Sequence, residues 1–248
     1  IGINSNDNNI IKVEIIDKHT KKKSYLKGDY FFSSMPVKHL VRSLNTDIPK
    51  EILNISEGLV YRDFITVGLL LNELKVKHNN ERGNKLIKDN WIYIQEPDVL
   101  VGRLQIFNNW SPYMISDRNK VWIGLEYFCN KGDKIWNKSD MEMIRLAIFE
   151  LDKIGIISKK DVIDSTVIKM EKTYPAYFGT YKYFNKLRKY LDTFENLFLV
   201  GRNGMHKYNN QDHSMLTAME AVNNIINKIT TKDNIWAVNT EQEYHEKN

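Results

Sequence analysis

The stretch GRNGMHKYNNQDHSMLTAMEA, residues 201–221, decides the fold. It follows the apolar run NLFLV (196–200) and opens with a glycine-containing turn, which permits close ligand approach because glycine has no Cβ atom. Good N-cap residues at 209–212 predict a helix whose free amide groups and dipole attract an anion. Arg202 adds a planar guanidinium suited to paired phosphate oxygens. The pattern therefore predicts an anion or dinucleotide site, or else an ordinary turn before a capped helix.

Composition bounds the class of protein. The 248 residues can form one large or two modest domains, and 42% hydrophobic residues suffice for a packed core. The net charge of +5 comes from scattered lysines, which is typical of a solvated surface and also suits an anionic ligand. The single cysteine, Cys129, excludes an intramolecular disulfide and fits a cytoplasmic protein, and the scattered histidines predict no metal site. The longest apolar run, 65–71, is far shorter than the roughly 20 residues of a membrane helix.

The first third of the chain predicts strands that give way to a helix. Residues 10–16 (IIKVEII) are rich in β-branched side chains, which favour a strand. A second, short strand is expected at Tyr30–Phe32, and Pro36 is suited to the first position of a helix over 37–44. Ser34 is the candidate cap of that helix.

The middle of the chain predicts a sheet and a helix. Strand-like segments separated by turn clusters occur at 61–74, 90–97, 102–110 and 121–129. The cluster at 116–119 predicts an antiparallel hairpin. Ser139 and Glu142 form a capping box at the start of a helix that ends at Gly155. The expected core face of this helix consists of Met141, Ile144, Ile148, Leu151 and Ile154. A further strand is expected near 162–170.

The last third is more helical. One helix is expected to bury a face made of Tyr181, Phe184, Leu187, Leu191 and Phe194. The apolar run at 197–200 predicts a short buried strand directly before the glycine-containing turn. In the helix that follows the turn, the expected core side consists of Met215, Met219, Val222 and Ile226.

Three segments together resemble a flavoprotein superfamily. FLVGRNGMHKYNNQDHSMLTAMEAV (198–222) closely resembles the C-terminal FAD signature shared by UDP-galactopyranose mutases, protoporphyrinogen oxidase-like proteins and amine oxidases. Its Gly-Arg-x-Gly turn, its tyrosine and its helix-start aspartate fall on residues 201–204, Tyr208 and Asp212. DYFFSSMPVKHL (29–40) and EKTYPAYFGTY (171–181) resemble the segments that return the chain to the FAD domain. The three motifs occur in the family's order along nearly the whole chain.

The resemblance implies an α+β fold with two parts. A substrate domain with a mixed or antiparallel sheet and helices is expected at 46–172. The C-terminal elements of a Rossmann-like FAD-binding domain are expected at 1–45 and 173–232, with a tail at 233–248. The family opens with a GxGxxG fingerprint, which this sequence lacks, so we expect a Rossmann unit before Ile1 in a longer parent protein. FAD is expected in that intact protein, whereas this chain alone is expected to lack FAD and to be inactive.

The resemblance also implies roles for individual residues around the cofactor. Gly201 and Gly204 would let the backbone approach FAD, and Arg202 would face the flavin or the phosphates. Backbone amide groups at the helix start would meet the ribityl chain and the flavin pyrimidine edge, and these belong to Gln211, Asp212 and His213. The reaction itself would occur at the flavin, so the sequence identifies no catalytic residue.

The substrate side is less defined. Tyr208 matches a tyrosine that contacts the substrate diphosphate in the mutases, and Arg202 is a second candidate on the same turn. Tyr174 and Tyr177 belong to an aromatic cluster that could stack on a ring substrate. Residues 209–211 depart from the mutase pattern, and so does His206, which stands at an aromatic position. These departures count against a nucleotide sugar as substrate.

Three functions stay open on the sequence. The first is oxidation of a small molecule by hydride transfer to FAD, as in amine oxidases and protoporphyrinogen oxidases. The second is a UDP-galactopyranose mutase-like isomerisation of a nucleotide sugar. The third is a non-catalytic binding module for a glycan or single-stranded nucleic acid, although no nucleic-acid motif is present and nucleic acid is not expected as a partner. The sequence does not indicate an oligomeric state.

Several other side chains have both a structural and a functional interpretation. His206 and His213 flank the motif and could shuttle a proton or make structural hydrogen bonds. Arg103 and Arg118 lie near an aromatic cluster and could meet a phosphate, but solvated positions on the surface are the simpler expectation. Cys129 follows two aromatic residues and is expected to be buried.

Overall fold

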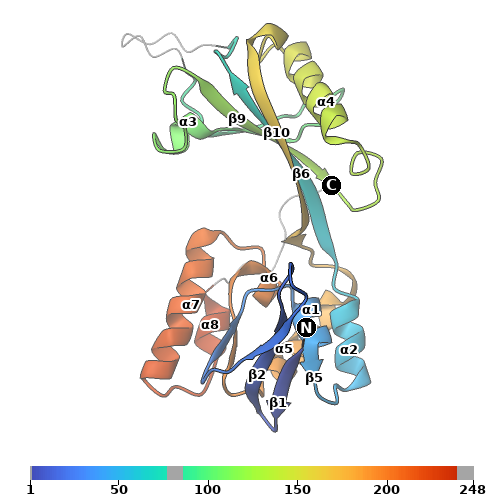
Figure 1. The fold of residues 1–248 in the computed structure, drawn as a ribbon, viewed down its shortest axis with the longest axis vertical. Helices are drawn as coiled ribbons and strands as arrows, with labels where there is room; N and C mark the ends of the chain where they lie inside the picture. The colour runs from blue at the N-terminus through green and yellow to red at the C-terminus, as the bar shows by residue number, and fades with distance from the viewer. Residues whose placement is uncertain (1, 77–85, 239–248) are drawn as a thin grey trace. The chain divides into compact units, whose positions relative to one another are not determined.

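The chain forms two compact units, which are described separately (Figure 1). The computed structural model describes residues 2–76 and 86–238. Unit 1 comprises the chain up to Tyr61 together with the chain from Tyr174 onward, and unit 2 comprises Arg62–Thr173. Both units contain helices and sheets, so the α+β class predicted from the sequence is confirmed.

The helices of unit 1 surround its core. They are α1 (Val37–Ser43), α2 (Lys50–Glu57), α5 (Phe184–Asp192), α6 (Gly201–Met205), α7 (Gln211–Ile226) and α8 (Asp233–Ala237), with a 3-10 turn at Gly179–Tyr183. Helix α2 packs against α1 and α5 and buries Ile52 and Ile55 in the core of unit 1. Residues 46–61, which the sequence grouped with the middle of the chain, therefore belong to unit 1. The boundary lies after α2 because the apolar face of this helix packs against α1 and α5, which belong to unit 1.

A four-stranded sheet forms one part of unit 1. It has the order β3-β2-β1-β5, with bounds β1 (Ile3–Asn6), β2 (Asn9–Ile16), β3 (Lys23–Leu26) and β5 (Leu44–Asn45). Strands β1 and β2 pair antiparallel, as do β2 and β3, whereas β1 and β5 run parallel. The strand predicted at 10–16 is confirmed.

A separate two-stranded parallel sheet joins distant parts of the sequence. Strand β4 (Phe31–Ser33) pairs with β11 (Leu197–Leu199), with Phe31 opposite Leu197 and Ser33 opposite Leu199. Helix α1 begins directly after Pro36, which occupies the N-cap without a side-chain cap. The predicted cap Ser34 was wrong, because the fixed backbone angle of proline already starts the helix.

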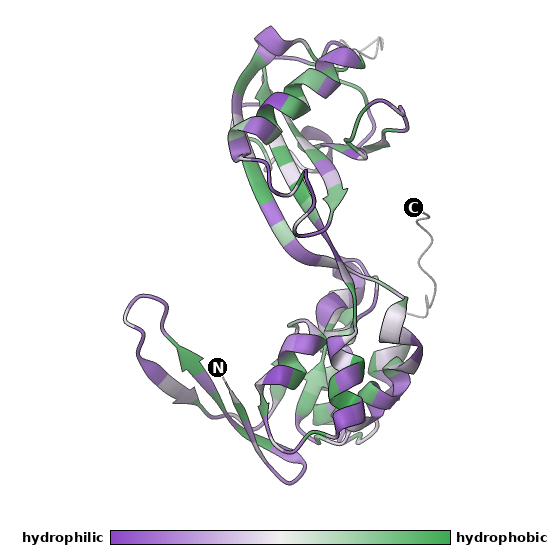
Figure 2. Cartoon of the chain, turned by 90° about the vertical axis from the view of Figure 1, so that its right-hand side faces the viewer, coloured by the Kyte–Doolittle hydropathy of each residue, from purple (hydrophilic) through white to green (hydrophobic). Residues whose placement is uncertain are grey.

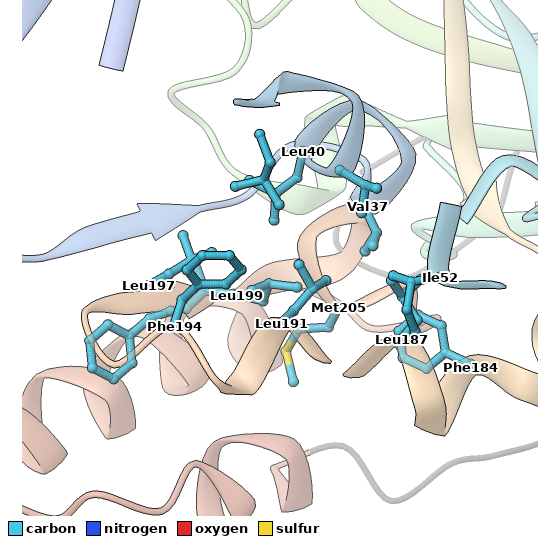
Figure 3. Packing of buried hydrophobic residues seen from close by; sticks show 14 of the residues in the cluster. Val37, Leu40, Ile52, Phe184, Leu187, Leu191, Phe194, Leu197, Leu199 and Met205 are labelled. Atoms are coloured by element: carbon cyan, nitrogen blue, oxygen red, sulfur yellow. The ribbon is translucent and has the colours of Figure 1, made fainter. Parts of the chain in front are cut away.

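The core of unit 1 lies between α1, α2, α5 and β11 (Figure 3). Leu187 and Leu191 on α5 are fully buried, and Phe184 and Phe194 are nearly so, which confirms these four residues of the predicted face. Tyr181, the fifth, is partly buried and lies in the 3-10 turn before α5. Lys232 closes the same region, because its Nζ donates to the carbonyl oxygens of Phe194 and Leu197 at 2.6 and 2.7 Å. Burial lowers the pKa of this ammonium group.

Helix α7 differs from the prediction. Its expected core side is exposed to solvent, and the residues concerned are Met215, Met219, Val222 and Ile226. Thr217, Ala221 and Asn224 are buried instead. These three side chains are small or form hydrogen bonds, which lets them pack against the neighbouring helices. The apolar periodicity therefore correctly identified an apolar face of α7, but unit 1 buries the opposite face.

The expected C-terminal tail is also partly wrong. Residues 233–237 form α8, in which Ile235 and Trp236 are buried in the core of unit 1. Trp236 Nε1 donates to the Asp192 carboxylate at 3.2 Å, which fixes α8 against α5. Residues 239–248 of the expected tail lie outside the described residues.

Unit 2 is a five-stranded sheet with one long helix against it. Its order is β10-β6-β9-β8-β7, with bounds β6 (Tyr61–Leu71), β7 (Trp91–Tyr93), β8 (Arg103–Ile106), β9 (Val121–Cys129) and β10 (Val162–Pro175). Strand β9 pairs antiparallel with β6 and with β8, which confirms the hairpin expected around 116–119. A one-turn helix, α3 (Phe107–Trp110), lies inside that connection, and a 3-10 turn at Lys159–Asp161 precedes β10.

Helix α4 (Asp140–Lys153) covers one face of this sheet (Figure 1). The predicted capping box is confirmed, since Glu142 N donates to Ser139 Oγ and Ser139 N donates to Glu142 Oε2. Gly155 has a φ of +80° and follows the helix as expected. The buried face carries Met143, Ala147 and Leu151, whereas the predicted core residue Met141 is exposed. In Figure 2, hydrophilic and hydrophobic residues alternate along α4.

Arg103 on β8 is buried, contrary to the expectation of a solvated position. Its Nη2 and Nε lie 2.6 and 2.9 Å from Glu126 Oε2 on β9. Gln105 Nε2 donates to Glu126 Oε1 at 2.5 Å. The guanidinium also stacks on aromatic rings, at 4.7 Å from the Trp91 centroid and 4.6 Å from that of Phe128. Arg103 can be buried because the Glu126 carboxylate and the aromatic rings take the place of the water molecules that would otherwise solvate its guanidinium.

The structure was also searched for membrane-spanning helices and for metal-binding clusters. Among residues 2–76 and 86–238, no helix has the length and apolar character needed to cross a bilayer. The described residues also contain no group of three or more histidine, cysteine or acidic side chains that could hold a metal ion. Cys129 is buried, as expected, and burial raises the pKa of its thiol to about 11.

The buried ion pair of unit 2 yields a stability prediction. Glu126→Ala removes the carboxylate from a buried arginine, so the free energy of unfolding should fall by about 3–5 kcal/mol. Glu171→Ala removes an exposed partner of Lys131 in the same unit and should cost less than about 1 kcal/mol. Urea denaturation of the two variants measures both values. Equal losses would contradict a structural role for the buried pair.

Candidate functional site

The candidate site lies at the carboxyl ends of the parallel strands β4 and β11. Val200 N donates to Ser33 O at 3.0 Å, which holds the two strand ends side by side. The chain then continues into α6 after β11 and toward α1 after β4. In open α/β sheets, ligands bind outside the carboxyl ends of the strands, where loops and helix starts converge.

Glycines permit the tight packing at this edge. A Cβ atom on Gly204 would lie 2.3 Å from Ser33 O, so only glycine lets α6 approach the end of β4 this closely. Gly201 has a φ of +77°, a conformation that other residues rarely adopt. Its backbone N donates to Thr217 Oγ1 on α7 at 3.1 Å. The two predicted glycines therefore bring the ends of β4 and β11 together with α6 and α7 in one corner.

Arg202 projects from this corner with part of its guanidinium unused. Nη1 donates to Asn209 O at 3.2 Å. Among the described residues, Nε and Nη2 are buried and have no hydrogen-bond partner. The guanidinium carbon lies 4.6 Å from the ring centroid of Tyr174 and 4.9 Å from that of Tyr208. These two nitrogen atoms carry three N–H groups, which are available to bind an anion or a carbonyl oxygen.

Two of the three candidate substrate tyrosines, Tyr174 and Tyr208, pack on Arg202, and the third, Tyr177, contacts Tyr208. The rings of Tyr174 and Tyr208 stack with centroids 5.7 Å apart. Tyr208 N donates to Tyr177 Oη at 2.6 Å, and the Tyr177 ring stacks on Tyr181 at 4.6 Å. Motifs about thirty positions apart in the sequence are thus brought together. The stacked rings fix the orientation of the guanidinium, which an isolated arginine would not maintain.

Helix α7 begins beside this cluster, at Gln211, as the sequence predicted. Asn210 is its N-cap residue, and Asn210 N donates to His213 Nδ1 at 3.4 Å. The first amide groups of a helix have no intrahelical acceptors, so those of Gln211, Asp212 and His213 form the positive end of α7. The Asp212 side chain is exposed. His213 is therefore part of the helix start, which favours a structural role over a proton shuttle.

Three residues of this corner were missed by the sequence analysis. Ser33, Asn209 and Thr217 are nearly or fully buried, and Ser33 Oγ and Asn209 Nδ2 lack partners among the described residues. Ser33 is the last residue of the short strand β4, three positions before Pro36. Its place at the end of a strand that precedes a helix was a sequence signal for a position near a ligand. Thr217 carried no such signal, because its importance comes from the hydrogen bond to Gly201.

His206 is a structural residue of the site. It is fully buried and ends α6 with a φ of +48°. Its Nε2 lies 3.1 Å from Ala176 O, and the rings of Tyr61, Tyr181 and Phe184 surround it. Burial lowers its pKa to about 4, so the imidazole is neutral at pH 7. A buried neutral ring between aromatic neighbours favours packing over proton shuttling.

His206 makes stability depend on pH. Unfolding exposes an imidazole with a pKa near 6.5, so below that pH the unfolded chain binds a proton that the folded chain does not bind until about pH 4. Stability is therefore fully present above pH 6.5 and falls as the pH drops, by about 2 kcal/mol between pH 7 and 4.5. His206→Asn tolerates the left-handed backbone and should lose this part of the pH dependence. Urea unfolding at both pH values checks it, and an unchanged slope in the variant would refute it.

Comparisons with known proteins agree with this fold. No family model matches the sequence, and no curated protein matches it significantly. The structure is similar to reduced UDP-galactopyranose mutase, with a TM-score of 0.69 and 19% identity over 98% of this chain and 50% of that chain. A protein described as a protoporphyrinogen oxidase from Exiguobacterium sp. 255-15 gives a TM-score of 0.57 and 14% identity, over 90% of this chain and 45% of its own.

A wild-type putrescine oxidase bound to putrescine is also similar, with a TM-score of 0.51 and 11% identity over 75% of this chain and 39% of its own. The chain thus shares the fold of part of each of these three proteins, in agreement with the resemblance noted in its sequence. It spans half or less of the length of each of these three proteins.

Proposed function

We propose that this chain supplies the C-terminal part of the FAD site of an FAD-dependent oxidoreductase that acts on a small molecule. The observation that carries the proposal is the buried Nε and Nη2 of Arg202, which lack partners among the described residues at the carboxyl ends of β4 and β11. The fold around these donors is similar to part of a UDP-galactopyranose mutase and part of a protoporphyrinogen oxidase, which supports the proposal. A preformed cationic edge beside a helix start is suited to a negatively charged cofactor.

The residues of the corner fit FAD chemically. FAD offers a pyrophosphate and a flavin pyrimidine edge, and when bound it accepts a hydride from the substrate. Arg202 would donate to one of these acceptors through its unpaired Nε and Nη2 atoms. The amide groups at the start of α7 would stabilise negative charge on the same cofactor. Ser33 and Asn209 each have a buried polar atom that could complete the contacts.

The glycines and tyrosines would prepare this site before the cofactor binds. Gly201 and Gly204 let the backbone come close enough for a cofactor to reach the strand ends. Tyr174 and Tyr208 hold the Arg202 guanidinium and shield it from water on their side. A donor that is already oriented loses less freedom on binding and therefore binds more tightly. Tyr177 would support Tyr208 through its backbone hydrogen bond.

A mutase-like isomerisation is the second candidate. The reduced UDP-galactopyranose mutase has the highest TM-score of the three similar structures, which favours this alternative. Tyr208 and Arg202 would then contact the diphosphate of a nucleotide sugar. The same flavin site serves both reactions, and net oxidation of the substrate distinguishes them. In both cases unit 1 would bind FAD, in a cytoplasmic protein.

Replacing Arg202 tests the proposed function. In the product of the complete gene, Arg202→Met keeps an unbranched side chain between the tyrosines but removes the donors, so FAD should bind roughly 10–100-fold more weakly. Arg118→Met removes an exposed arginine of unit 2 and should leave FAD affinity unchanged. Titration of the flavin-free proteins with FAD, followed by flavin fluorescence, measures both. If Arg202→Met binds FAD as tightly as the wild-type protein, Arg202 is not part of the FAD site.

A further inference from the structure

The hairpin formed by β2 and β3 carries most of the net charge of the protein. Lysines occur along the whole chain, yet residues 11–27 contain six of them against two acidic residues, which gives +4 of the total +5. The run of three consecutive lysines at 21–23 closes the turn between the two strands. The rest of the chain is close to neutral, so the attraction of this protein for an anionic partner is concentrated at the hairpin.

The end of this hairpin is exposed to solvent and has a defined turn. Every residue from 16 to 30 is exposed, and in Figure 2 the hydrophilic turn stands apart from the helices of unit 1. Asp17 Oδ1 accepts from the backbone N of His19 and of Thr20 at 2.9 and 2.6 Å. Lys21 N donates to Asp17 O at 2.9 Å. A partner therefore meets a preformed turn, which loses little freedom on binding.

Both acidic side chains of the hairpin are engaged within it. Glu14 Oε1 lies 2.8 Å from Lys23 Nζ on the facing strand. The Asp17 carboxylate is held by the amide groups of the turn. The hairpin therefore has no further acidic side chain to neutralise the exposed lysines of its turn, Lys18, Lys21 and Lys22.

Apolar side chains accompany the lysines on both faces of the hairpin. Ile16 lies opposite Lys23 in the register, and Tyr25 is on the same face because side chains alternate along a strand. Leu26 is on the other face. The exposed fractions of Tyr25 and Leu26 are 54% and 56%. Exposed lysines beside exposed apolar and aromatic side chains suit the headgroup region of a bilayer, where ammonium groups meet anionic lipids and apolar groups reach the acyl boundary.

We propose that the end of the β2–β3 hairpin binds the surface of a membrane that contains anionic lipids. The lysines of the turn contact the anionic groups of the lipid headgroups, and Ile16, Tyr25 and Leu26 enter the boundary between headgroups and acyl chains. Single-stranded nucleic acid also offers phosphates, but its bases stack on free aromatic ring faces. Lys12 Nζ lies 4.4 Å from the centroid of the Tyr25 ring and covers one of its faces, which favours the membrane.

Sedimentation with vesicles tests this membrane contact. The purified protein should bind vesicles of phosphatidylcholine mixed with phosphatidylserine and should not bind vesicles of phosphatidylcholine alone. Replacing Lys18, Lys21 and Lys22 together by Gln should weaken binding about 100-fold, because each lysine near an anionic leaflet strengthens binding several-fold. Leu26→Gln should weaken it several-fold, since less apolar surface then leaves water.

Matched variants serve as controls. Replacing Lys134, Lys160 and Lys189 together by Gln removes the same charge from exposed positions elsewhere, and Leu100→Gln changes an exposed leucine of unit 2. Both should leave vesicle binding nearly unchanged, because charges beyond about 10 Å are screened at 0.1 M salt. Failure to bind the mixed vesicles, or equal weakening in the two lysine variants, would overturn the proposal. Tighter binding to a single-stranded oligonucleotide than to vesicles, insensitive to Leu26→Gln, would assign the hairpin to nucleic acid instead.

Discussion

The close approach of Gly204 to the carbonyl oxygen of Ser33 is the constraint on which the candidate site depends. No other residue fits there, because a Cβ atom would lie 2.3 Å from that oxygen. The approach fixes α6 at the end of β4, and α6 carries Arg202. The left-handed conformation of Gly201 and its hydrogen bond to Thr217 then position the start of α7. A small set of backbone contacts thus orients the guanidinium and the helix start toward one region.

Both units bury charged side chains, and most of these have hydrogen-bond or ion-pair partners. Arg103 and Glu126 in unit 2 satisfy each other within a ring of aromatic side chains. Lys232 in unit 1 is satisfied by carbonyl oxygens. Arg202 differs from these, because two of its nitrogen atoms are buried and have no partner among the described residues. Buried polar groups are normally paired, and the unpaired nitrogen atoms of Arg202 are the observation on which the proposed ligand role rests.

Much of the secondary structure was predictable from the sequence. The capping box at Ser139, the strand after residue 196 and the helix start at Gln211 are set by local chemistry and were found. The turn with Arg202 was also found, because glycine, arginine and N-cap residues follow one another in the chain. The stacking of Tyr174 on Tyr208 was not predictable, since it joins segments that only the fold brings together.

The errors share a physical cause. The face of α7 was inferred from apolar periodicity, but burial depends on which neighbours exist, and α6 and α8 contact its polar side. Arg103 was expected in solvent because arginine is rarely buried, yet its carboxylate partner lies on the next strand. The helix at 233–237 was assigned to a tail because five residues give too little periodicity to detect. Tertiary contacts decided each case.

The central claim is that the corner of β4, β11 and α7 forms part of a flavin site. The most direct measurement is a visible absorption spectrum of the product of the complete gene, beside that of this chain alone. The account predicts flavin bands in the longer protein and none in this chain. Absence of flavin bands from both, even after addition of FAD, would contradict the account and reduce the corner to a structural connection.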